Sequence, residues 1–251
     1  MIAIAALTER MIRITLKDDL PFAILATAGI FGFFNFALRN VIDTGHTNYA
    51  QYVLPVIIVQ VTFLCALTTV DRAANDQRSG FGVAIRTLPI PVVVPLIARM
   101  LYCLFRGALA LLAALAVGYL SGFRMGGGFF YTAAFVVFVL LFTLALSLGA
   151  DATGTAAARS AIVKTGASSQ LLLIPQMLLV MLSTGMAPAD SFPDWLHSFV
   201  QYQPVSQITQ TLQGFATGHV LVSNLATSVA WCLGLLVVFG ALAVRMQRRT
   251  E

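Results

Sequence analysis

The stretch 52–72, YVLPVIIVQVTFLCALTTVDR, decides the fold of this chain. It runs for nineteen residues without a charge before Asp71 and Arg72 end it. A helix of that length rises roughly 28 Å at 1.5 Å per residue, close to the hydrocarbon thickness of a bilayer at about 30 Å. Its residues do not alternate in polarity as the strands of a membrane barrel do. The stretch therefore predicts a transmembrane helix.

Five more apolar runs of similar length lie along the chain. The six predicted spans cover about 20–38, 52–70, 100–120, 129–148, 170–186 and 220–244. The chain is 59% hydrophobic and 10% charged, whereas soluble domains have about 45–50% and roughly 25%. We expect an all-α membrane protein with one transmembrane domain over residues 1–251. The spans leave no room for a nucleotide-binding domain, and the sequence has no GxxxxGK(S/T) phosphate loop.

The charged residues, 15 Lys and Arg against 10 Asp and Glu, are scattered between the apolar runs. We interpret them as topology markers and expect no nucleic-acid partner. Placing the N-terminus inside leaves Arg39 and Arg124 outside. The basic residues then on the inner side are Arg10, Arg13, Lys17, Arg72, Arg78, Arg86, Arg99, Arg159, Lys164, Arg245, Arg248 and Arg249. This bias predicts a multi-pass protein of the cell membrane with both termini cytoplasmic.

The first nineteen residues mix apolar and basic side chains, with Met11, Ile12 and Ile14 among Arg10, Arg13 and Lys17. Such a mixture predicts a helix lying in the cytoplasmic interface of the membrane, and a frayed terminus is the alternative. The charges follow the first apolar stretch and no small-residue cleavage site comes after them. We therefore expect no cleaved signal peptide.

None of the predicted spans contains Asp, Glu or His, and we expect all ten acids in termini or loops. Proton-driven transporters usually place such groups within their spans, so this sequence disfavours proton-driven transport. Four polar residues in the spans are candidates for a translocation path, with interhelical hydrogen bonding as the alternative role. They are Asn35, Gln60, Thr62 and Gln176. Arg106, two turns beyond Arg99, is interpreted as a structural anchor in the third span.

Catalytic and metal-binding patterns are missing from the sequence. His46, His197 and His219 fall in predicted outer loops, and their spacing is not that of a zinc site. Ser183 has no GxSxG context, and the three cysteines lie within apolar runs without a CxxC motif. We expect no catalytic residue, no metal and no cofactor on this chain. An intramembrane enzyme is the alternative from a different class.

The inner loop between the second and third spans can form a short amphipathic helix over 81–88. Ser79 and Gly80 open it, and Pro89 and Pro91 stop it. Its residues and the basic residue before it are Arg78, Phe81, Val83, Ile85, Arg86 and Leu88. An exposed apolar face on such a helix indicates docking into a groove of a partner, and lying flat on the membrane is the alternative.

The outer segment between the fifth and sixth spans is long and carries interfacial aromatics. Residues 193–202 and 206–215 have apolar residues at helical spacing. They predict two short re-entrant helices that dip into the outer leaflet, with a plain surface loop as the alternative. The residues that mark this segment are Pro193, Trp195, Tyr202, Pro204 and Gln213.

Two segments carry a family resemblance. The inner RSGFGVAIRTLPIPVVVPLIAR (78–99) and the outer TGMAPADSFPDWLHSFVQYQPVSQITQTLQGFATG (184–218) come with a six-span plan. Together they resemble the type-2 ABC transporter permeases. Among these permeases, the resemblance is to the daunorubicin-resistance group of actinobacteria. Where such permeases often have Leu-Arg before the Gly, this chain has Leu212-Gln213. Whether Gln213 replaces a functional basic residue is left open.

The resemblance implies a permease subunit of an ATP-driven exporter for a hydrophobic drug or lipid. In such exporters the segment around 81–88 is a coupling helix that docks into a separate ATP-binding cassette ATPase, which holds the ATP and Mg. A second permease, identical or similar, completes the pump, and substrate leaves between the two. A permease that exports polysaccharide is the alternative. The resemblance settles neither the substrate nor the choice between homodimer and heterodimer.

Overall fold

The computed structural model describes residues 7–9, 12–13, 19–38, 49–79, 93–159, 169–186 and 192–248. Within these ranges the regular elements are helices, without a strand, so the all-α prediction is confirmed there. The helices are α2 (Asp19–Leu38), α3 (Tyr49–Arg78), α5 (Val93–Leu120), α6 (Gly128–Arg159), α7 (Gln170–Met181), α8 (Asp194–Tyr202), α9 (Pro204–Thr217) and α10 (Val222–Arg248).

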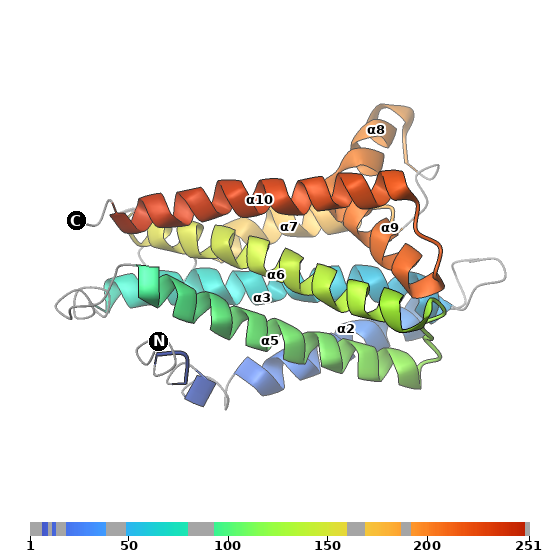
Figure 1. The fold of residues 1–251 in the computed structure, drawn as a ribbon, viewed down its shortest axis with the longest axis horizontal. Coiled ribbons are helices and arrows are strands. Elements are labelled where there is room, and N and C mark those ends of the chain that lie inside the picture. The colour runs from blue at the N-terminus through green and yellow to red at the C-terminus, as the bar shows by residue number, and fades with distance from the viewer. Residues whose placement is uncertain are drawn as a thin grey trace.

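The helices α2, α3, α5, α6, α7 and α10 run side by side and alternate in direction (Figure 1). One end of this bundle holds the last turn of α3 and the first turn of α5, and is called the Arg78 end. The other end carries α8 and α9, and is called the α9 end. The start of α2 and the end of α10 both face the Arg78 end.

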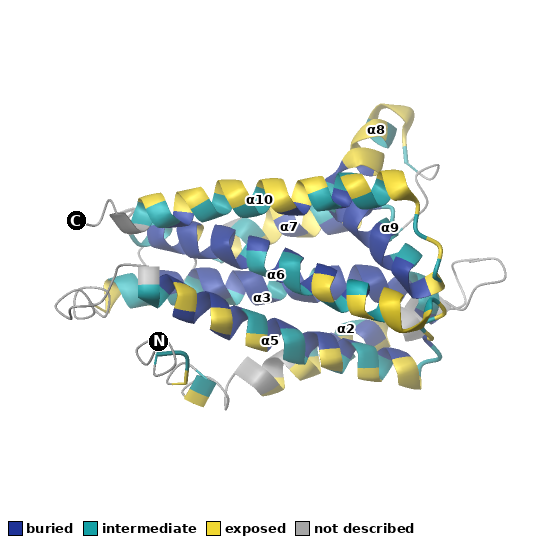
Figure 2. Ribbon diagram, in the orientation of Figure 1, coloured by how far each residue is buried: buried dark blue, intermediate teal, exposed yellow. Residues whose placement is uncertain are grey.

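The helix α3 forms the centre of the bundle. Leu54, Val56 and Val59 are at most 1% exposed, and α3 packs most extensively against α6. By contrast, α10 lies on the outside and exposes apolar side chains such as Leu233 and Val237 (Figure 2). An apolar outer surface with a well-packed interior is what a helix bundle in lipid requires, because lipid tails do not disfavour exposed Leu and Val.

Among the described residues, four helices are long and apolar enough to cross a membrane. They are α3, α5, α6 and α10. Within α2 and α7 the described apolar stretches are shorter, Ile24–Phe33 and Leu172–Met181. Several membrane-spanning helices are therefore present, whereas a count of six spans stays a prediction.

The helices differ in length from the predicted spans at several places. The second span continues past Asp71 to Arg78, the third begins at Val93 instead of near residue 100, and the fourth continues to Arg159. The fifth is shorter, because α7 ends at Met181 and turns follow it. Helical hydrogen bonds run along the backbone, so a helix can continue where the side chains become polar.

The expectation that all acids lie in termini or loops was also wrong. Asp71 and Asp76 lie on α3, and Asp151 lies on α6. These carboxylates are on helical extensions beyond the apolar runs, where side chains of neighbouring helices can pair with them.

At the N-terminus, residues 7–9 and 12–13 are helical. Arg13 donates from Nη2 to Oε1 of Glu9 at 2.7 Å, and both side chains are mostly exposed. An exposed pair of this kind contributes little stability. The rest of the predicted interfacial helix lies outside the described residues, so its place at the membrane stays a prediction.

Candidate functional site

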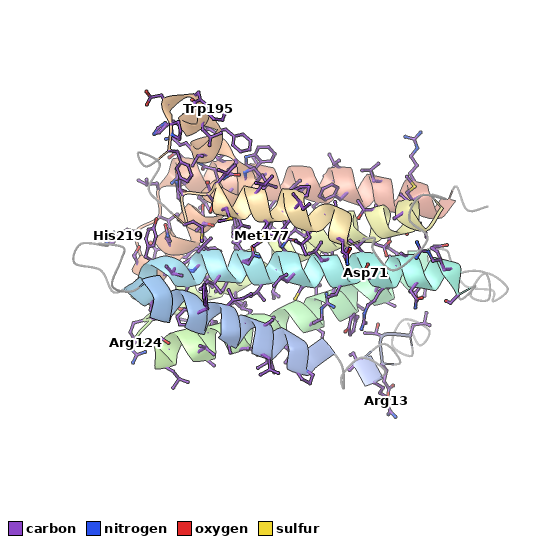
Figure 3. The ribbon with its side chains drawn as sticks, turned by 180° about the vertical axis from the view of Figure 1, so that it is seen from behind. Arg13, Asp71, Arg124, Met177, Trp195 and His219 are labelled. Carbon is purple, nitrogen blue, oxygen red and sulfur yellow. The ribbon has the colours of Figure 1, made fainter. Side chains whose placement is uncertain are left out.

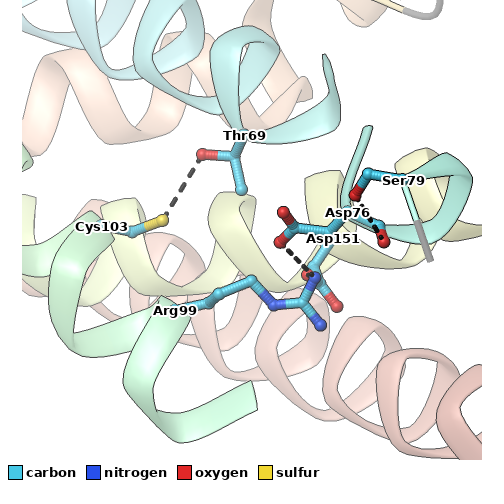
Figure 4. Close-up of polar contacts among 6 residues, drawn as sticks. All are labelled: Thr69, Asp76, Ser79, Arg99, Cys103 and Asp151. Atoms are coloured by element: carbon cyan, nitrogen blue, oxygen red, sulfur yellow. Dashed lines mark hydrogen bonds and ion pairs between the residues drawn. The ribbon is translucent and has the colours of Figure 1, made fainter. Parts of the chain in front are cut away.

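An ion cluster joins three helices at the Arg78 end (Figure 4). The Nη1 atom of Arg99, on α5, lies 3.2 Å from Oδ1 of Asp151 on α6 and 3.6 Å from Oδ2 of Asp76 on α3. Asp151 is fully buried and Arg99 is 9% exposed, whereas the Asp76 side chain is 30% exposed. One guanidinium therefore holds a buried and a partly exposed carboxylate.

One turn beyond Asp151, α6 approaches the α3 backbone closely. A Cβ atom at Gly154 would lie 2.3 Å from the carbonyl oxygen of Val70 and 2.8 Å from Cβ of Ala73. Only a glycine fits such an approach, because any side chain would meet a backbone atom. The ends of α3 and α6 are thus seated against each other beside the ion cluster.

Arg106 ties α5 to α3 deeper in the bundle. Its Nη2 donates to the carbonyl oxygen of Cys65 and, at 3.2 Å, to Oγ1 of Thr69. Its guanidinium also lies 5.8 Å from the ring centroid of Tyr102, which Arg72 approaches to 5.0 Å. Arg106 is 4% exposed, so these contacts support the anchor interpretation.

The predicted coupling segment lies mostly outside the described residues. Arg78 is the last residue of α3 and is exposed at the bundle end. Phe81, Val83, Ile85, Arg86 and Leu88 are not described. A docking role for this segment therefore stays a prediction, although the helices on both of its sides are placed.

The candidate path residues lie on three helices. Asn35 is on α2, and its side chain is outside the described part of the structure. Thr62 on α3 donates its hydroxyl at 2.8 Å to the carbonyl oxygen of Ile58, one turn earlier on the same helix, so this bond does not join two helices. The side chains of Gln60 on α3 and Gln176 on α7 each bury an Oε1 atom that has no hydrogen-bond partner among the described residues.

A small cavity lies between α3, α5 and α6. Thr62, Cys65, Gly107 and Val139 are among the residues that line it. Its volume is about 10 Å³, roughly the room that one water molecule needs. This cavity is too small to hold a drug or a lipid, so it is not a substrate site.

The outer segment forms the two short helices that were predicted. Pro193 precedes α8, and Pro204 is the first residue of α9. Trp195 and Tyr202 of α8 are 80% and 63% exposed, and Figure 3 shows Trp195 at the tip of the projecting helix. Exposed aromatics of this type are typical of a membrane interface. A re-entrant path through the outer leaflet stays a prediction.

A polar network around α9 was missed by the sequence reasoning. Ser206 accepts from the backbone N–H of Thr184 at 3.0 Å, and Gln210 donates from Nε2 to Oγ1 of Thr184, also at 3.0 Å. Asn224 of α10 donates to Oε1 of Gln210 at 3.0 Å. The recurrence of Gln203, Ser206 and Gln210 at helical spacing could have indicated a polar face on α9. The spacing alone does not reveal that Thr184 and Asn224 are the hydrogen-bond partners.

Gln213 takes part in the packing of α9 on α3. Its Nε2 donates to the carbonyl oxygen of Tyr52 at 3.0 Å, and the Tyr52 hydroxyl donates to the carbonyl oxygen of Thr184 at 2.8 Å. Gln213 therefore has a structural contact of its own in this bundle.

We expect Gln210→Leu to lower the free energy of unfolding by about 1 to 2 kcal/mol. The change removes one hydrogen bond to α10 and one to the turn after α7, and it leaves both partners unpaired. Interhelical hydrogen bonds in membrane proteins are worth about 0.6 kcal/mol each on average. Unfolding in mixed micelles with increasing SDS measures the effect. Gln170→Leu, at an exposed position on α7, is the matched control. Equal losses in the two variants would contradict the role of the network.

The described residues offer no metal site. Within the described ranges no three His, Cys, Asp or Glu side chains gather in a way that could hold a metal ion. His219 follows α9, and its position at the α9 end is seen in Figure 3. His197, on the exposed α8, has no metal-binding partners among these residues either.

Comparison with known proteins places this bundle in a family. Residues 20–245 match the ABC-2 family transporter protein family. The chain is 31% identical over 185 residues to the doxorubicin resistance ABC transporter permease protein DrrB of Mycobacterium tuberculosis, a match covering 74% of this chain and 61% of that protein.

Two further relatives are also permeases of drug resistance ABC transporters. The probable doxorubicin resistance ABC transporter permease protein DrrC of Mycobacterium tuberculosis is 27% identical, with 72% of this chain and 65% of that protein covered. The daunorubicin resistance ABC transporter permease protein DrrB1 of Streptomyces coeruleorubidus is 24% identical, with 80% and 69% covered. The chain thus spans less than two thirds of the length of the two mycobacterial relatives. With the family match over nearly all of its helices, this multi-pass membrane protein belongs to the ABC-2 transporter family.

Proposed function

We propose that the chain is the membrane-spanning permease subunit of an ATP-driven exporter that moves a hydrophobic drug or lipid out of the cell. The observation that carries the proposal is the family match over residues 20–245. The names of its relatives, which refer to doxorubicin and daunorubicin resistance, favour an amphipathic aromatic drug as one substrate.

The energy for export comes from a second protein, an ATP-binding cassette ATPase that holds ATP and Mg. The sequence contains no phosphate loop, and proton coupling would need an ionisable group that can change its charge during transport. The buried acid of α6, Asp151, is paired with Arg99 instead. That pairing favours a structural role for the carboxylate over proton transfer.

The permease crosses the membrane six times with the Arg78 end in the cytoplasm. The alternating directions of the helices support this arrangement, with α2 and α7 as the two spans of shorter apolar length. Arg72, Arg78, Arg99 and Arg245 lie toward the Arg78 end, whereas Arg124 lies at the α9 end (Figure 3). The positive-inside rule then favours cytoplasmic termini.

A second permease subunit completes the pump and forms the path with this one. The cavity described between α3, α5 and α6 has room for about one water molecule, so it cannot form the path of a drug or a lipid. The exposed apolar side chains of α7, which include Ile174, Met177 and Leu178, offer a surface for a path between the two subunits. At the outer side, α8 and α9 border the path.

The segment around 81–88 docks into the ATPase, and a double substitution tests this. We expect Phe81→Asp combined with Arg86→Asp to abolish co-purification with the partner ATPase. The changes remove the apolar anchor and reverse the charge of a helix that must enter a groove. ATP-dependent uptake of doxorubicin into inverted vesicles should be lost as well.

Arg245→Asp is the control for this experiment, because Arg245 is an exposed basic residue on α10 toward the same bundle end. It should leave the complex and the uptake of doxorubicin intact. Complex formation that survives the double substitution would refute the docking role. Stimulation of the ATPase by glycan carriers and not by amphipathic drugs would identify a polysaccharide exporter instead.

A further inference from the structure

We propose that Asp76, Arg99 and Asp151 form a transmission site that passes movement of the segment 80–92 to α6. The proposal rests on the proposed function, in which this segment contacts the ATPase. The three side chains would act as positioning residues, because they touch neither ATP nor substrate. They would determine how large a displacement the transmembrane helices undergo when the ATPase moves the segment.

The cluster holds both ends of the segment. The helix before it, α3, ends at Arg78 and carries Asp76 in its last turn. The helix after it, α5, begins at Val93 and carries Arg99 in its second turn. The contact between Asp76 and Arg99 at 3.6 Å therefore closes the loop of chain that contains the segment. A force on the segment acts on the end of α3 and the start of α5, which this contact joins.

The two ion pairs differ in how easily they break. Asp151 is fully buried, and separating a buried carboxylate from its cation leaves an uncompensated charge in a low-dielectric interior. Asp76 is 30% exposed, so it can reach solvent when it leaves Arg99. Arg99 thus has two arrangements, one with both acids and one with Asp151 alone. Opening the Asp76 contact is the less costly change.

The second arrangement moves α5 and α6 together. Arg99 remains attached to Asp151, so a displacement of the start of α5 pulls on α6. Near the cluster, α6 meets the α3 backbone through Gly154. About two turns before Asp76, the Thr69 hydroxyl on α3 lies 3.4 Å from the Cys103 sulfur on α5. The ion cluster is therefore at the junction where these three helices either move as one body or separate.

Asp76→Asn tests the proposal without exposing a buried charge. The purified complex of permease and ATPase is reconstituted into vesicles, and ATP hydrolysis and doxorubicin uptake are measured in the same sample. We expect assembly, thermal stability and ATP hydrolysis close to those of the wild type. The doxorubicin transported per ATP should change by about two- to thirtyfold, the range that residues of a coupling network produce. Asp76→Glu, which keeps the charge, should restore the wild-type ratio.

Asp71→Asn is the matched control. Asp71 lies five residues earlier on α3, and its Oδ1 accepts a hydrogen bond from the backbone N–H of Ser169 at 3.0 Å, away from the segment. This variant should keep the wild-type ratio. The proposal is overturned if Asp76→Asn also keeps it, if Asp71→Asn changes it equally, or if transport and hydrolysis fall in proportion to lost folded protein. A wild-type complex without ATP-dependent uptake would instead refute the proposed function, before any variant is compared.

Discussion

Replacing Asp151 by alanine is expected to lower the free energy of unfolding by about 3 to 5 kcal/mol. The change leaves Arg99 buried without the carboxylate that lies 3.2 Å from its Nη1 atom. Asp76 compensates only in part, because it is more distant and partly exposed. Reversible unfolding of the purified protein in micelles with increasing SDS gives the difference directly.

A double variant separates the lost charge pair from lost packing. Arg99→Met combined with Asp151→Leu removes both charges and keeps apolar volume at the site. Apolar replacement of a whole buried ion pair is often neutral or stabilising. We therefore expect this protein to be much more stable than Asp151→Ala. Similar losses in both variants would show that packing, and not charge, determines the effect.

Gly154→Ala should destabilise the protein by about 1 to 3 kcal/mol, as overpacking of a well-packed interior does. The new methyl group would lie 2.3 Å from the carbonyl oxygen of Val70, a backbone atom that cannot rotate away. The helices α3 and α6 must then separate. The same SDS unfolding assay applies, and the loss should be accompanied by lower export if the two helices move together.

Gly234→Ala is the control for the close approach. No atom lies within 4 Å of a Cβ built at this position on α10. Because alanine is the better helix former by about 1 kcal/mol, this variant should be neutral or slightly more stable than the wild type. A Gly154→Ala protein that behaves in the same way would mean that α6 can shift without cost.

The helical core of the fold could be predicted because lipid imposes a simple rule. A chain that crosses hydrocarbon needs a long apolar run, and 52–70 and 129–148 are such runs. The extensions to Arg78 and Arg159 could not be predicted in that way, because the charged residues there interrupt the apolar runs. In the structure Arg99 lies inside α5, where neighbouring helices supply its acids.

The candidate site could be predicted only where a local pattern marks it. Helical spacing of apolar and aromatic residues predicted α8 and α9, and Gln60 and Gln176 stood out as polar residues in apolar runs. The pairing of Arg99 with Asp151 depends on the tertiary packing of α5 on α6, for which a single sequence holds no signal. The glycine contact of α6 with Val70 is equally non-local.

The polar packing of α9 has a consequence for how the α9 end of the bundle could open. Ser206 and Thr211 are at most 1% exposed, and their hydroxyl groups hold this helix to its neighbours by hydrogen bonds. Water can replace those hydrogen bonds at a small net cost, whereas it gains nothing from an apolar face. If α9 separated from its neighbours, water would enter and bind the polar groups that it leaves. Such a contact can hold α9 closed and still open when a substrate arrives together with water.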